Sequence, residues 1–315
     1  MAKPIKTVST VVAEIEDTGA SVRKFVLADQ DDWELPPFRP GAHIDVHLAP
    51  GLVRTYSLCN EPADNRRYVI AVKCEQDGRG GSKFMHEQLA VGDRIGVSIP
   101  RGGIALSPHA TNVFVAGGIG VTPFISAIRH LERQGLTNYV LHWASRGEPN
   151  LLGMIPQTAS ARVHLYDTSR QSKPAIGEIV AAFASAGQAS CCGPMSMLET
   201  FERAVETWPE DRRHVERFTP PKRVALNDTP PYELVLAASR KQATVVPELG
   251  LLGTLEALGA DVPVSCGGGI CGACRTRWTE GPPIHRDRVL SAAERQSEMI
   301  VCVGDCAGSR LVLDL

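Results

Sequence analysis

Four cysteines near the carboxyl end of the chain constrain its fold more than any other feature of the sequence. Cys266, Cys271 and Cys274 are separated by four and then two residues, and Cys302 follows later. This is the plant-type spacing of thiolates that hold a two-iron, two-sulfur cluster. Glycines between Cys266 and Cys271 let the backbone wrap closely around a cluster and point N–H groups at its sulfurs. The spacing therefore predicts a [2Fe-2S] centre.

A structural zinc site and a chance grouping are the alternatives to that centre. Tetrahedral zinc sites usually pair two short C-x2-C units or add histidines, and neither pattern is present here. Cys306 follows Cys302 closely and is predicted not to be a ligand, because four ligands already complete the site. The remaining cysteines lie in apolar contexts and are predicted to be buried small hydrophobes: Cys59, Cys74, Cys191 and Cys192.

Composition and charge exclude several other classes of protein. The 315 residues include 33 basic and 35 acidic side chains, for a formal net charge of -2, which argues against a dedicated nucleic-acid binder. No apolar run approaches the roughly 18 residues of a membrane-spanning helix, and the N-terminal residues lack the apolar region of a secretory signal. Nine cysteines, an odd number, are unlike a secreted disulfide scaffold. We therefore expect a cytoplasmic protein of several domains.

The pattern of apolar segments divides the chain into three parts. Residues 1–105 contain short strands between turn signals, which favours a small antiparallel barrel. Residues 106–222 alternate strands with helices, which is typical of a parallel α/β sheet. Residues 223–230, within the proline-rich stretch 219–231, form an expected linker, and residues 231–315 form the third part.

Individual elements follow from the same pattern. The expected strands are residues 21–27, 43–48, 54–58, 68–73 and 93–99 in the first part, 112–116, 139–144, 162–166 and 189–192 in the second, and 232–237, 243–246, 300–302 and 310–315 in the third. The expected helices are residues 83–89 and 123–134, a helix after Pro194, and residues 252–258.

A glycine-rich segment begins at Gly117, after the first strand of the second part and before a helix. Backbone N–H groups that open such a helix can bind a pyrophosphate. The segment departs from the G-x-G-x-x-G pattern because Pro123 replaces the last glycine, and the next strand ends in Ser145-Arg146 without an acidic residue. The alternative is a tight strand-to-helix turn that binds nothing. Gly193 ends a later strand and would lie at the same edge of the sheet.

The strand that begins at Arg54 combines a cation, an aromatic ring and two hydroxyl groups, a set that can bind a phosphate and flank a flat ring. Gly80, Gly81 and Ser82 precede an expected helix and supply further N–H donors. Taken alone, Arg54 is more typical of a surface ion pair than of a phosphate site. Three histidines are predicted to be structural or exposed: His43, His47 and His142.

Taken in order, these motifs resemble the phthalate dioxygenase reductase family, the reductases of Rieske-type oxygenases, which includes the vanillate demethylase reductases. The matching segments run along essentially the whole chain: RTYSLCN, YVIAVK, GRGGS, VAGGIGVTP, CCGPMSM, CGGGICGAC and the terminal LVLDL. One departure is the run of three glycines in the cysteine loop. The resemblance implies an antiparallel β-barrel flavin domain, an α/β parallel-sheet nucleotide domain and a β-grasp plant-type ferredoxin domain.

The resemblance also implies the members of each site. FMN would be bound by Arg54, Thr55, Tyr56, Ser57, Ala71, Val72, Lys73, Gly80, Gly81, Ser82 and Phe218. NADH would be bound by Gly118, Gly120, Thr122, Pro123, Ser145, Arg146, Cys192, Gly193, Pro194 and Met195. The metal ligands would be Cys266, Cys271, Cys274 and Cys302.

The function implied is that of an oxidoreductase that passes electrons from NADH through FMN to the [2Fe-2S] cluster. The acceptor would be a terminal Rieske-type oxygenase, a separate polypeptide that docks transiently and acts on an aromatic or similar small substrate. No side chain is expected to be a catalytic acid or base, because the work of the protein is positioning. Three alternatives stay open: FAD in place of FMN, another acceptor such as a cytochrome P450, and a non-enzymatic iron–sulfur redox sensor.

Overall fold

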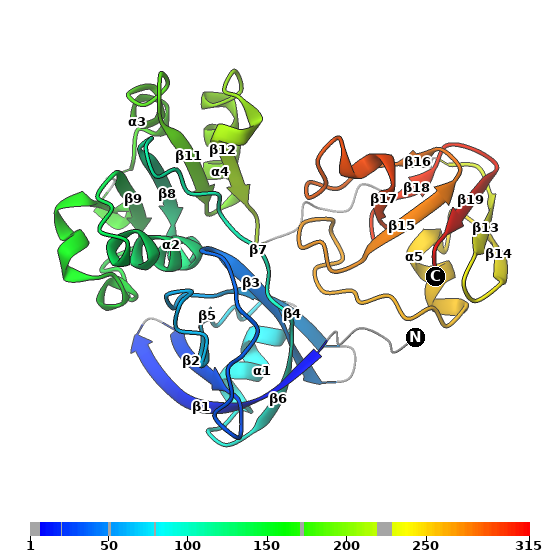
Figure 1. Cartoon of the computed structure of the whole chain (residues 1–315), viewed down its shortest axis with the longest axis horizontal. Coiled ribbons are helices and arrows are strands. Elements are labelled where there is room, and N and C mark those ends of the chain that lie inside the picture. The colour runs from blue at the N-terminus through cyan, green and yellow to red at the C-terminus, as the bar shows by residue number, and fades with distance from the viewer. Residues whose placement is uncertain (1–6, 20, 50–51, 79, 171–172, 219–228) are drawn as a thin grey trace. The chain divides into compact units, whose positions relative to one another are not determined.

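The computed structural model describes residues 7–19, 21–49, 52–78, 80–170, 173–218 and 229–315 (Figure 1). The chain divides into two compact units, Met1–Phe218 and Thr219–Leu315. The first unit contains an antiparallel sheet and a parallel sheet, and the second contains a mixed sheet with a helix. The three-part fold class predicted from the sequence is therefore confirmed. Most of the expected linker lies outside the described residues.

The antiparallel sheet has the strand order β4-β3-β6-β1-β2-β5, with β7 paired to β3. An isolated bridge between Leu58 and Ile70 joins the two ends of this order, and the Cys59 N–H donates to the Val69 carbonyl at 2.7 Å. The sheet therefore closes into a barrel. Its elements are β1 (Thr7–Gly19), β2 (Val22–Ala28), β3 (Ala42–Ala49), β4 (Leu52–Ser57), β5 (Arg67–Lys73), α1 (Gly81–Glu87), β6 (Arg94–Ser98) and β7 (Arg101–Gly102).

Alternation along the strands determines which side chains fill the barrel, since successive residues point to opposite faces. Phe25 and Leu27 of β2 are fully buried with Ile44 and Val46 of β3 in one apolar core. Val26 of β2 points outward and joins a second core, which is shared with the parallel sheet. The barrel is therefore apolar on both faces where it meets that sheet.

The second sheet is entirely parallel and has the order β10-β9-β8-β11-β12. Helix α2 covers one face, where Phe124 stacks on Phe114 of β8. Helices α3 and α4 cover the other face. The elements are β8 (Asn112–Gly117), η1 (Gly118–Val121), α2 (Thr122–Arg133), β9 (Tyr139–Ser145), η2 (Leu152–Met154), η3 (Gln157–Arg162), β10 (Val163–Asp167), η4 (Thr168–Arg170), α3 (Ile176–Ala181), β11 (Gln188–Cys192), α4 (Met195–Ala204), η5 (Glu210–Arg212) and β12 (Arg213–Glu216).

The strand order reverses at β8, whose neighbours are β9 on one side and β11 on the other. Chains that leave adjacent strands in opposite directions open a crevice at the carboxyl edge of the sheet, where ligands of open α/β sheets bind. Both glycine-containing segments identified in the sequence begin at this reversal.

The second unit has the sheet order β14-β13-β19-β15-β17, in which β13 and β19 run parallel and the other pairs run antiparallel. Leu251 and Leu255 of α5 pack in the core beneath it. The elements are β13 (Tyr232–Leu236), β14 (Lys241–Val245), α5 (Gly250–Ala257), β15 (Arg275–Glu280), β16 (Pro283–Ile284), η6 (Glu294–Gln296), β17 (Glu298–Ile300), β18 (Asp305–Cys306) and β19 (Arg310–Leu313).

Several details differ from the sequence prediction. Strands β1, β12 and β15 and helix α3 were not predicted. Helix α1 begins at Gly81, two residues before the predicted start, and the strand expected at residues 300–302 ends at Ile300, with Cys302 in the following turn. Cys74 was expected to be buried, which is wrong: β5 ends one residue earlier and leaves this side chain partly exposed.

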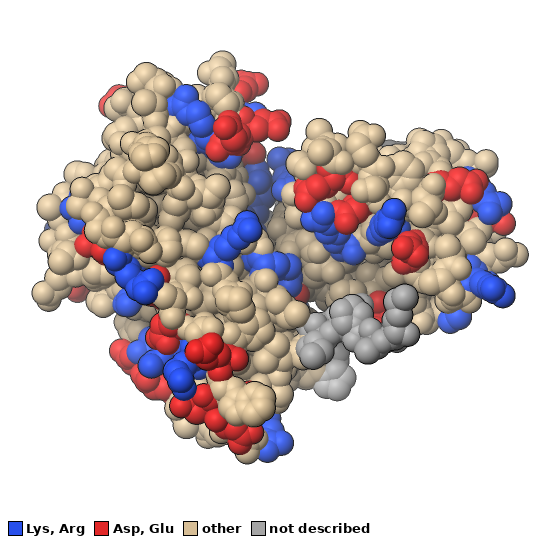
Figure 2. All heavy atoms as spheres, in the orientation of Figure 1, with Lys and Arg blue, Asp and Glu red and all other residues tan. Residues whose placement is uncertain are grey.

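In the described ranges, no helix has the length and apolar character needed to cross a membrane. Basic and acidic side chains are interspersed on the face shown in Figure 2, which fits the nearly balanced charge of the sequence.

Two aromatic residues test the assignment of the barrel interior. Phe25 is fully buried, whereas Trp33 is 72% exposed. Phe25→Ala should lower the free energy of unfolding of the first unit by about 3–5 kcal/mol because it leaves a cavity. Trp33→Ala should change it by no more than about 0.5 kcal/mol. Urea denaturation of both variants checks this, and similar losses for the two would contradict the assignment.

Candidate functional site

The four cysteines of the predicted cluster are all buried in the second unit. Cys266, Cys271 and Cys274 lie on one loop, residues 266–274, which we call the cysteine loop. Cys302 approaches from the turn after β17. Thiol–thiol contacts join Cys266 to both Cys271 and Cys302, and Cys274 to Cys302. The fold therefore brings together the four side chains that the sequence selects.

Backbone N–H groups of the cysteine loop point at these sulfurs. The Gly268 N–H lies 3.4 Å from the Cys266 sulfur, and contacts with Cys271 and Cys302 hold the pKa of Cys266 well below its usual range. Thiol contacts raise the pKa of Cys302, whereas the backbone of Gly269 acts on this pKa in the opposite direction and favours the thiolate. Such donors stabilise thiolate ligands, so the loop fits an anionic iron–sulfur cluster.

Left-handed backbone explains the glycines of the cysteine loop. Gly267, Gly269 and Gly272 have φ angles of +64°, +71° and +70°, a region that residues with a Cβ atom rarely adopt. At Gly269 a Cβ would also lie 2.7 Å from a methyl group of Val303. Glycine is therefore the residue that lets the backbone of the cysteine loop adopt this conformation.

Cys306 is buried outside this group. Its thiol donates to the Arg310 carbonyl at 3.3 Å and accepts the Gly308 N–H at 3.4 Å. No three His, Cys, Asp or Glu side chains in the described part of the chain form a group suited to a single metal ion.

The two glycine segments of the parallel sheet meet at its carboxyl edge. A Cβ on Gly120 would overlap the Cys192 carbonyl, and one on Gly193 would lie 3.1 Å from the Gly117 backbone. Gly118 is exposed with a φ of +55°, and its carbonyl accepts the Trp143 indole N–H at 3.0 Å. Close backbone approach therefore requires Gly120 and Gly193, whereas a Cβ on Gly118 would meet no atom within 4 Å.

The remaining predicted nucleotide residues surround the same edge. Thr122 and Pro123 are buried in the first turn of α2, and Met195 is 37% exposed at the start of α4. Ser145 donates its hydroxyl to the Gly147 carbonyl at 2.7 Å, and Arg146 is exposed. Pro194 is exposed between β11 and α4.

Strand β4 presents its polar side chains in different directions. The Arg54 side chain lies directly against Gly81, where a Cβ would overlap it, so a cation adjoins the first turn of α1. The Thr55 hydroxyl instead donates at 2.7 Å to the buried carboxylate of Asp45, which also binds Arg101 at 2.6 Å. Arg54 and Gly81 can thus share a phosphate, whereas the Thr55 side chain supports the strand.

The other predicted flavin residues lie on neighbouring segments. Ala71 and Val72 are buried in β5, and Lys73 at its end pairs with Glu75 at 2.6 Å. Tyr56 is half-buried in β4, Gly80 is exposed, and the Ser82 hydroxyl accepts the Glu75 N–H at 3.1 Å. Phe218 is 38% exposed at the end of the first unit.

Glu216 contacts predicted site residues, and the sequence analysis did not identify it. It ends β12 beside Cys192 of β11, and it accepts a hydrogen bond of 2.9 Å from the Ser57 hydroxyl. Burial raises the pKa of Glu216 to about 7, although the hydrogen bond from Ser57 opposes this. The contact joins the predicted flavin strand to the predicted nicotinamide edge across 159 residues of sequence.

Two of the three histidines pack against other residues, and the third is exposed. His43 is half-buried against Gly102, and His47 is exposed. The His142 ring stacks on His164 with centroids 4.8 Å apart, and burial lowers the pKa of His142 to about 4.

Comparison with known proteins gives matches over the full length. Residues 236–303 match the model of the 2Fe-2S iron-sulfur cluster binding domain. The chain is 36% identical to tetrachlorobenzoquinone reductase of Sphingobium chlorophenolicum, with 100% of both chains covered. It is 33% identical to phthalate dioxygenase reductase of Burkholderia cepacia, with 96% of both chains covered.

Two solved structures are similar as well. One is phthalate dioxygenase reductase, described as a modular structure for electron transfer from pyridine nucleotides to [2Fe-2S]. Its TM-score is 0.71 at 31% identity, with 98% of both chains covered. The other is an intact type IV self-sufficient cytochrome P450 monooxygenase, with a TM-score of 0.88 at 30% identity. All of this chain is covered, but it spans only 43% of that P450 chain.

The raised pKa of Glu216 predicts a pH-dependent contribution to stability. The folded protein holds this proton more tightly than the unfolded chain, so stability falls as pH rises from 4.5, the ordinary value, to about 7. Glu216→Gln keeps an acceptor oxygen for Ser57 and lacks the charge. The melting temperature of Glu216→Gln minus that of the wild type should therefore increase between about pH 5 and about pH 8. Exposed Glu206→Gln is the control, and a flat difference for Glu216→Gln would contradict the burial.

Proposed function

This chain belongs to the phthalate dioxygenase reductase family, and we propose that the residues described above bind its cofactors and lead electrons toward a separate oxygenase. The chain is an oxidoreductase, the electron-transfer reductase component of an oxygenase system, with FMN, a [2Fe-2S] cluster and NADH as its cofactors. When bound, the flavin accepts a hydride and releases electrons one at a time, which the single-electron cluster requires. The roles of individual residues are the proposal.

The hydrogen bond between Ser57 and Glu216 carries this proposal. It fixes the β4 strand of the barrel against the carboxyl edge of the parallel sheet, next to Cys192. A flavin on β4 and a nicotinamide at that edge would then face each other within one compact unit. Hydride transfer depends on such positioning more than on acid or base groups.

The flavin residues divide their work by position. Arg54 and the residues that open α1, Gly80, Gly81 and Ser82, bind the FMN phosphate, because a guanidinium and backbone N–H groups both donate to phosphate oxygens. Tyr56 of β4 flanks the isoalloxazine ring, and β5 contacts the flavin through Ala71, Val72 and Lys73. Thr55, whose hydroxyl is held by Asp45, stiffens the strand.

The residues proposed to bind NADH form two groups, one for its pyrophosphate and one for its two nucleoside ends. Gly118 and Gly120, with Thr122 and Pro123 at the start of α2, form the pyrophosphate side of the crevice, where the N-terminus of a 12-residue helix favours an anion. Ser145 and Arg146 border the adenosine. Cys192, Gly193, Pro194 and Met195 border the nicotinamide, and the buried Cys192 thiol stays neutral because burial raises its pKa.

The second unit supplies the one-electron carrier. The four buried cysteines would hold the cluster, and the N–H groups of the cysteine loop favour the thiolate state. We propose three domains along the chain: an FMN domain at residues 1–105, an NADH domain at 106–222 and a ferredoxin domain at 231–315, with the linker at 223–230.

The proposed partner is a terminal Rieske-type oxygenase, a separate cytoplasmic polypeptide that docks transiently. Next to the cysteine loop, Arg288 and Val289 are exposed on the segment of residues 287–290. A cation beside an exposed apolar side chain suits the small, salt-sensitive interfaces of redox partners. The expected partner surface is acidic. A cytochrome P450 is the second candidate acceptor, favoured by the similarity to the self-sufficient P450.

An anaerobic titration with NADH tests the chain of carriers. Flavin absorbance should bleach first and cluster absorbance afterwards, and the flavin released on denaturation should be FMN. Bleaching of the flavin without reduction of the cluster would refute the proposed path. Absence of flavin from the purified protein would refute the FMN site.

Substitution of Cys302 and of Cys306 tests which of these two buried cysteines is a cluster ligand. Cys302→Ala should abolish iron and sulfide binding and leave flavin reduction by NADH unchanged. Cys306→Ala should retain the cluster, because its thiol contacts the Arg310 carbonyl and the Gly308 N–H instead. Iron, sulfide and flavin contents and the electron paramagnetic resonance (EPR) signal of the reduced protein check this. The reverse pattern would contradict the proposed ligand set.

Charge reversal tests the docking surface. Arg288→Glu should raise the KM for the oxygenase about two- to tenfold at low salt and weaken the salt dependence of turnover. NADH-dependent ferricyanide reduction should not change. The control is Lys241→Glu on β14, the edge strand opposite β17 in the sheet order. Equal effects of both variants, or of neither, would argue against this surface.

A further inference from the structure

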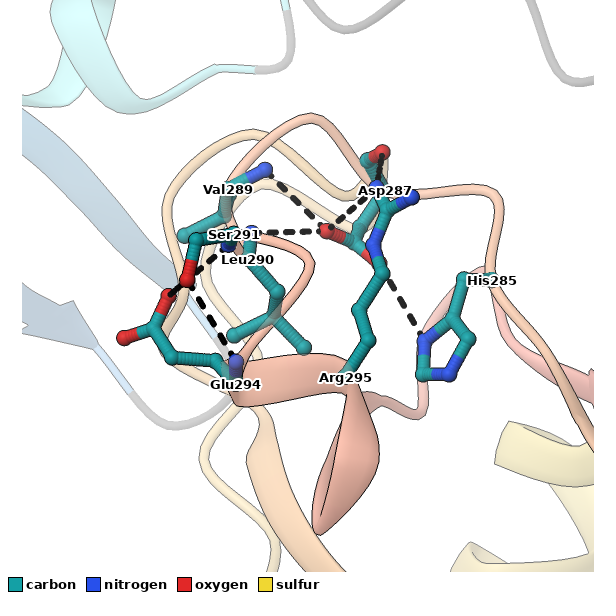
Figure 3. A network of polar contacts seen from close by, with 7 residues as sticks. All are labelled: His285, Asp287, Val289, Leu290, Ser291, Glu294 and Arg295. Atoms are coloured by element: carbon teal, nitrogen blue, oxygen red, sulfur yellow. Dashed lines mark hydrogen bonds and ion pairs between the residues drawn. The ribbon is translucent and has the colours of Figure 1, made fainter. Parts of the chain in front are cut away.

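Asp287 is a buried carboxylate with no role in ligation, placed next to the cysteine loop (Figure 3). Only 1% of its side chain is exposed. It begins the 287–290 segment, which connects β16 to η6. A buried charge at such a place needs a compensating set of contacts.

One carboxylate oxygen of Asp287 organises the segment that follows. Oδ2 accepts the Val289 N–H at 3.1 Å and the Leu290 N–H at 2.8 Å. The Arg295 guanidinium donates to the Asp287 carbonyl at 2.9 Å and lies 3.5 Å from Oδ2. Figure 3 shows the two N–H groups and the Arg295 guanidinium converging on Oδ2, with the guanidinium also reaching the backbone carbonyl. The shape of the 287–290 segment therefore depends on Oδ2.

The other oxygen of Asp287 is used differently. Oδ1 has no hydrogen-bond partner among the described residues and lies 3.8 Å from Nδ1 of His285, which has none there either. An amide NH2 in place of Oδ1 would face that nitrogen from 3.8 Å and would displace no existing hydrogen bond. An asparagine at this position can therefore keep the acceptor of the segment while losing the charge.

The 287–290 segment in turn supports the cysteine loop. The Arg288 N–H donates to the Gly269 carbonyl at 3.0 Å. A Cβ on Gly269 would lie 3.2 Å from the Asp287 Cα, so the two backbones are in close contact. The N–H of the adjacent Gly268 points at the sulfur of Cys266, with the nitrogen 3.4 Å from that sulfur. A continuous set of contacts thus runs from Asp287 to a proposed cluster ligand.

We propose that Asp287 is a positioning residue that sets the reduction potential of the cluster by holding the cysteine loop at Gly269, so that the adjacent Gly268 N–H stays aimed at the Cys266 sulfur. This inference rests on the proposed ligand role of the four cysteines. N–H donors to ligand sulfurs stabilise the added negative charge of the reduced cluster, which raises its potential. Loss of the support should therefore make the potential more negative.

The sign of the shift separates this role from simple electrostatics. Removal of a nearby negative charge, acting alone, favours the reduced cluster and raises the potential. Loss of the N–H···S geometry acts in the opposite direction. Asp287→Ala removes both the charge and the acceptor, whereas Asp287→Asn removes only the charge.

The experiment compares the full-length wild type, Asp287→Ala and Asp287→Asn, each loaded with flavin and cluster. The cluster midpoint potential is measured by redox titration, followed by the EPR signal of the reduced cluster. We expect a more negative midpoint and altered g values for Asp287→Ala. Asp287→Asn should keep the wild-type g values, with a midpoint that is unchanged or more positive.

Other results are equally decisive. Similar positive shifts of the midpoint potential in both variants would assign the effect to charge and overturn the proposal. A lower melting temperature of Asp287→Ala with an unchanged midpoint potential would overturn it as well. Cluster loss from Asp287→Ala alone would support the proposal, because the loop then requires the acceptor, whereas loss from both variants would overturn it. A wild type without a [2Fe-2S] cluster would instead refute the proposed ligands.

Discussion

One apolar core spans the barrel and the parallel sheet, and the proposed flavin–nicotinamide site depends on it. Val22, Val26 and Val69 point out of the barrel and pack with Phe124 and Ile128 of α2. Side chains on the outer face of a barrel are normally polar where they meet water. The apolar outer face of this barrel is therefore stable only when it packs against the parallel sheet and α2. The hydrophobic effect scales roughly with the apolar area buried and does not depend on the orientation of the groups. Directional polar contacts, such as the hydrogen bond between Ser57 and Glu216, then select one arrangement of the two sheets.

In the second unit, too, apolar packing forms the core and polar contacts fix the local arrangement. Leucines of α5 and the central strands form the core, whereas the cysteine loop is shaped by glycines in left-handed conformation and by the segment that Asp287 organises. An iron–sulfur protein must hold four thiolates close together, which mutual repulsion opposes, and backbone N–H groups relieve that repulsion without adding side chains. The path of the backbone in the loop is thus itself part of the electrostatics of the site.

Much of this architecture was predictable from local sequence. Alternating and helical apolar spacing identified most strands and α2, and the cysteine spacing identified a group of residues that the fold brings together. Strand β1 was missed because, beyond its first residues, its sequence is largely polar, and much of its outward face is exposed. Glu216 and Asp287 were missed for a different reason: a lone acidic residue has no local pattern, and its contacts with Ser57 and with Gly269 exist only in the folded chain.

The indole of Trp143 lies beneath the glycine segment at the edge of the parallel sheet, with its N–H bound to the Gly118 carbonyl. Because Trp143 is almost fully buried, its emission is sensitive to this carbonyl and to the packing around it more than to bulk water. The chain thereby contains an intrinsic fluorophore at the crevice, in a position to report optically on movement of the Gly118 backbone without any attached label.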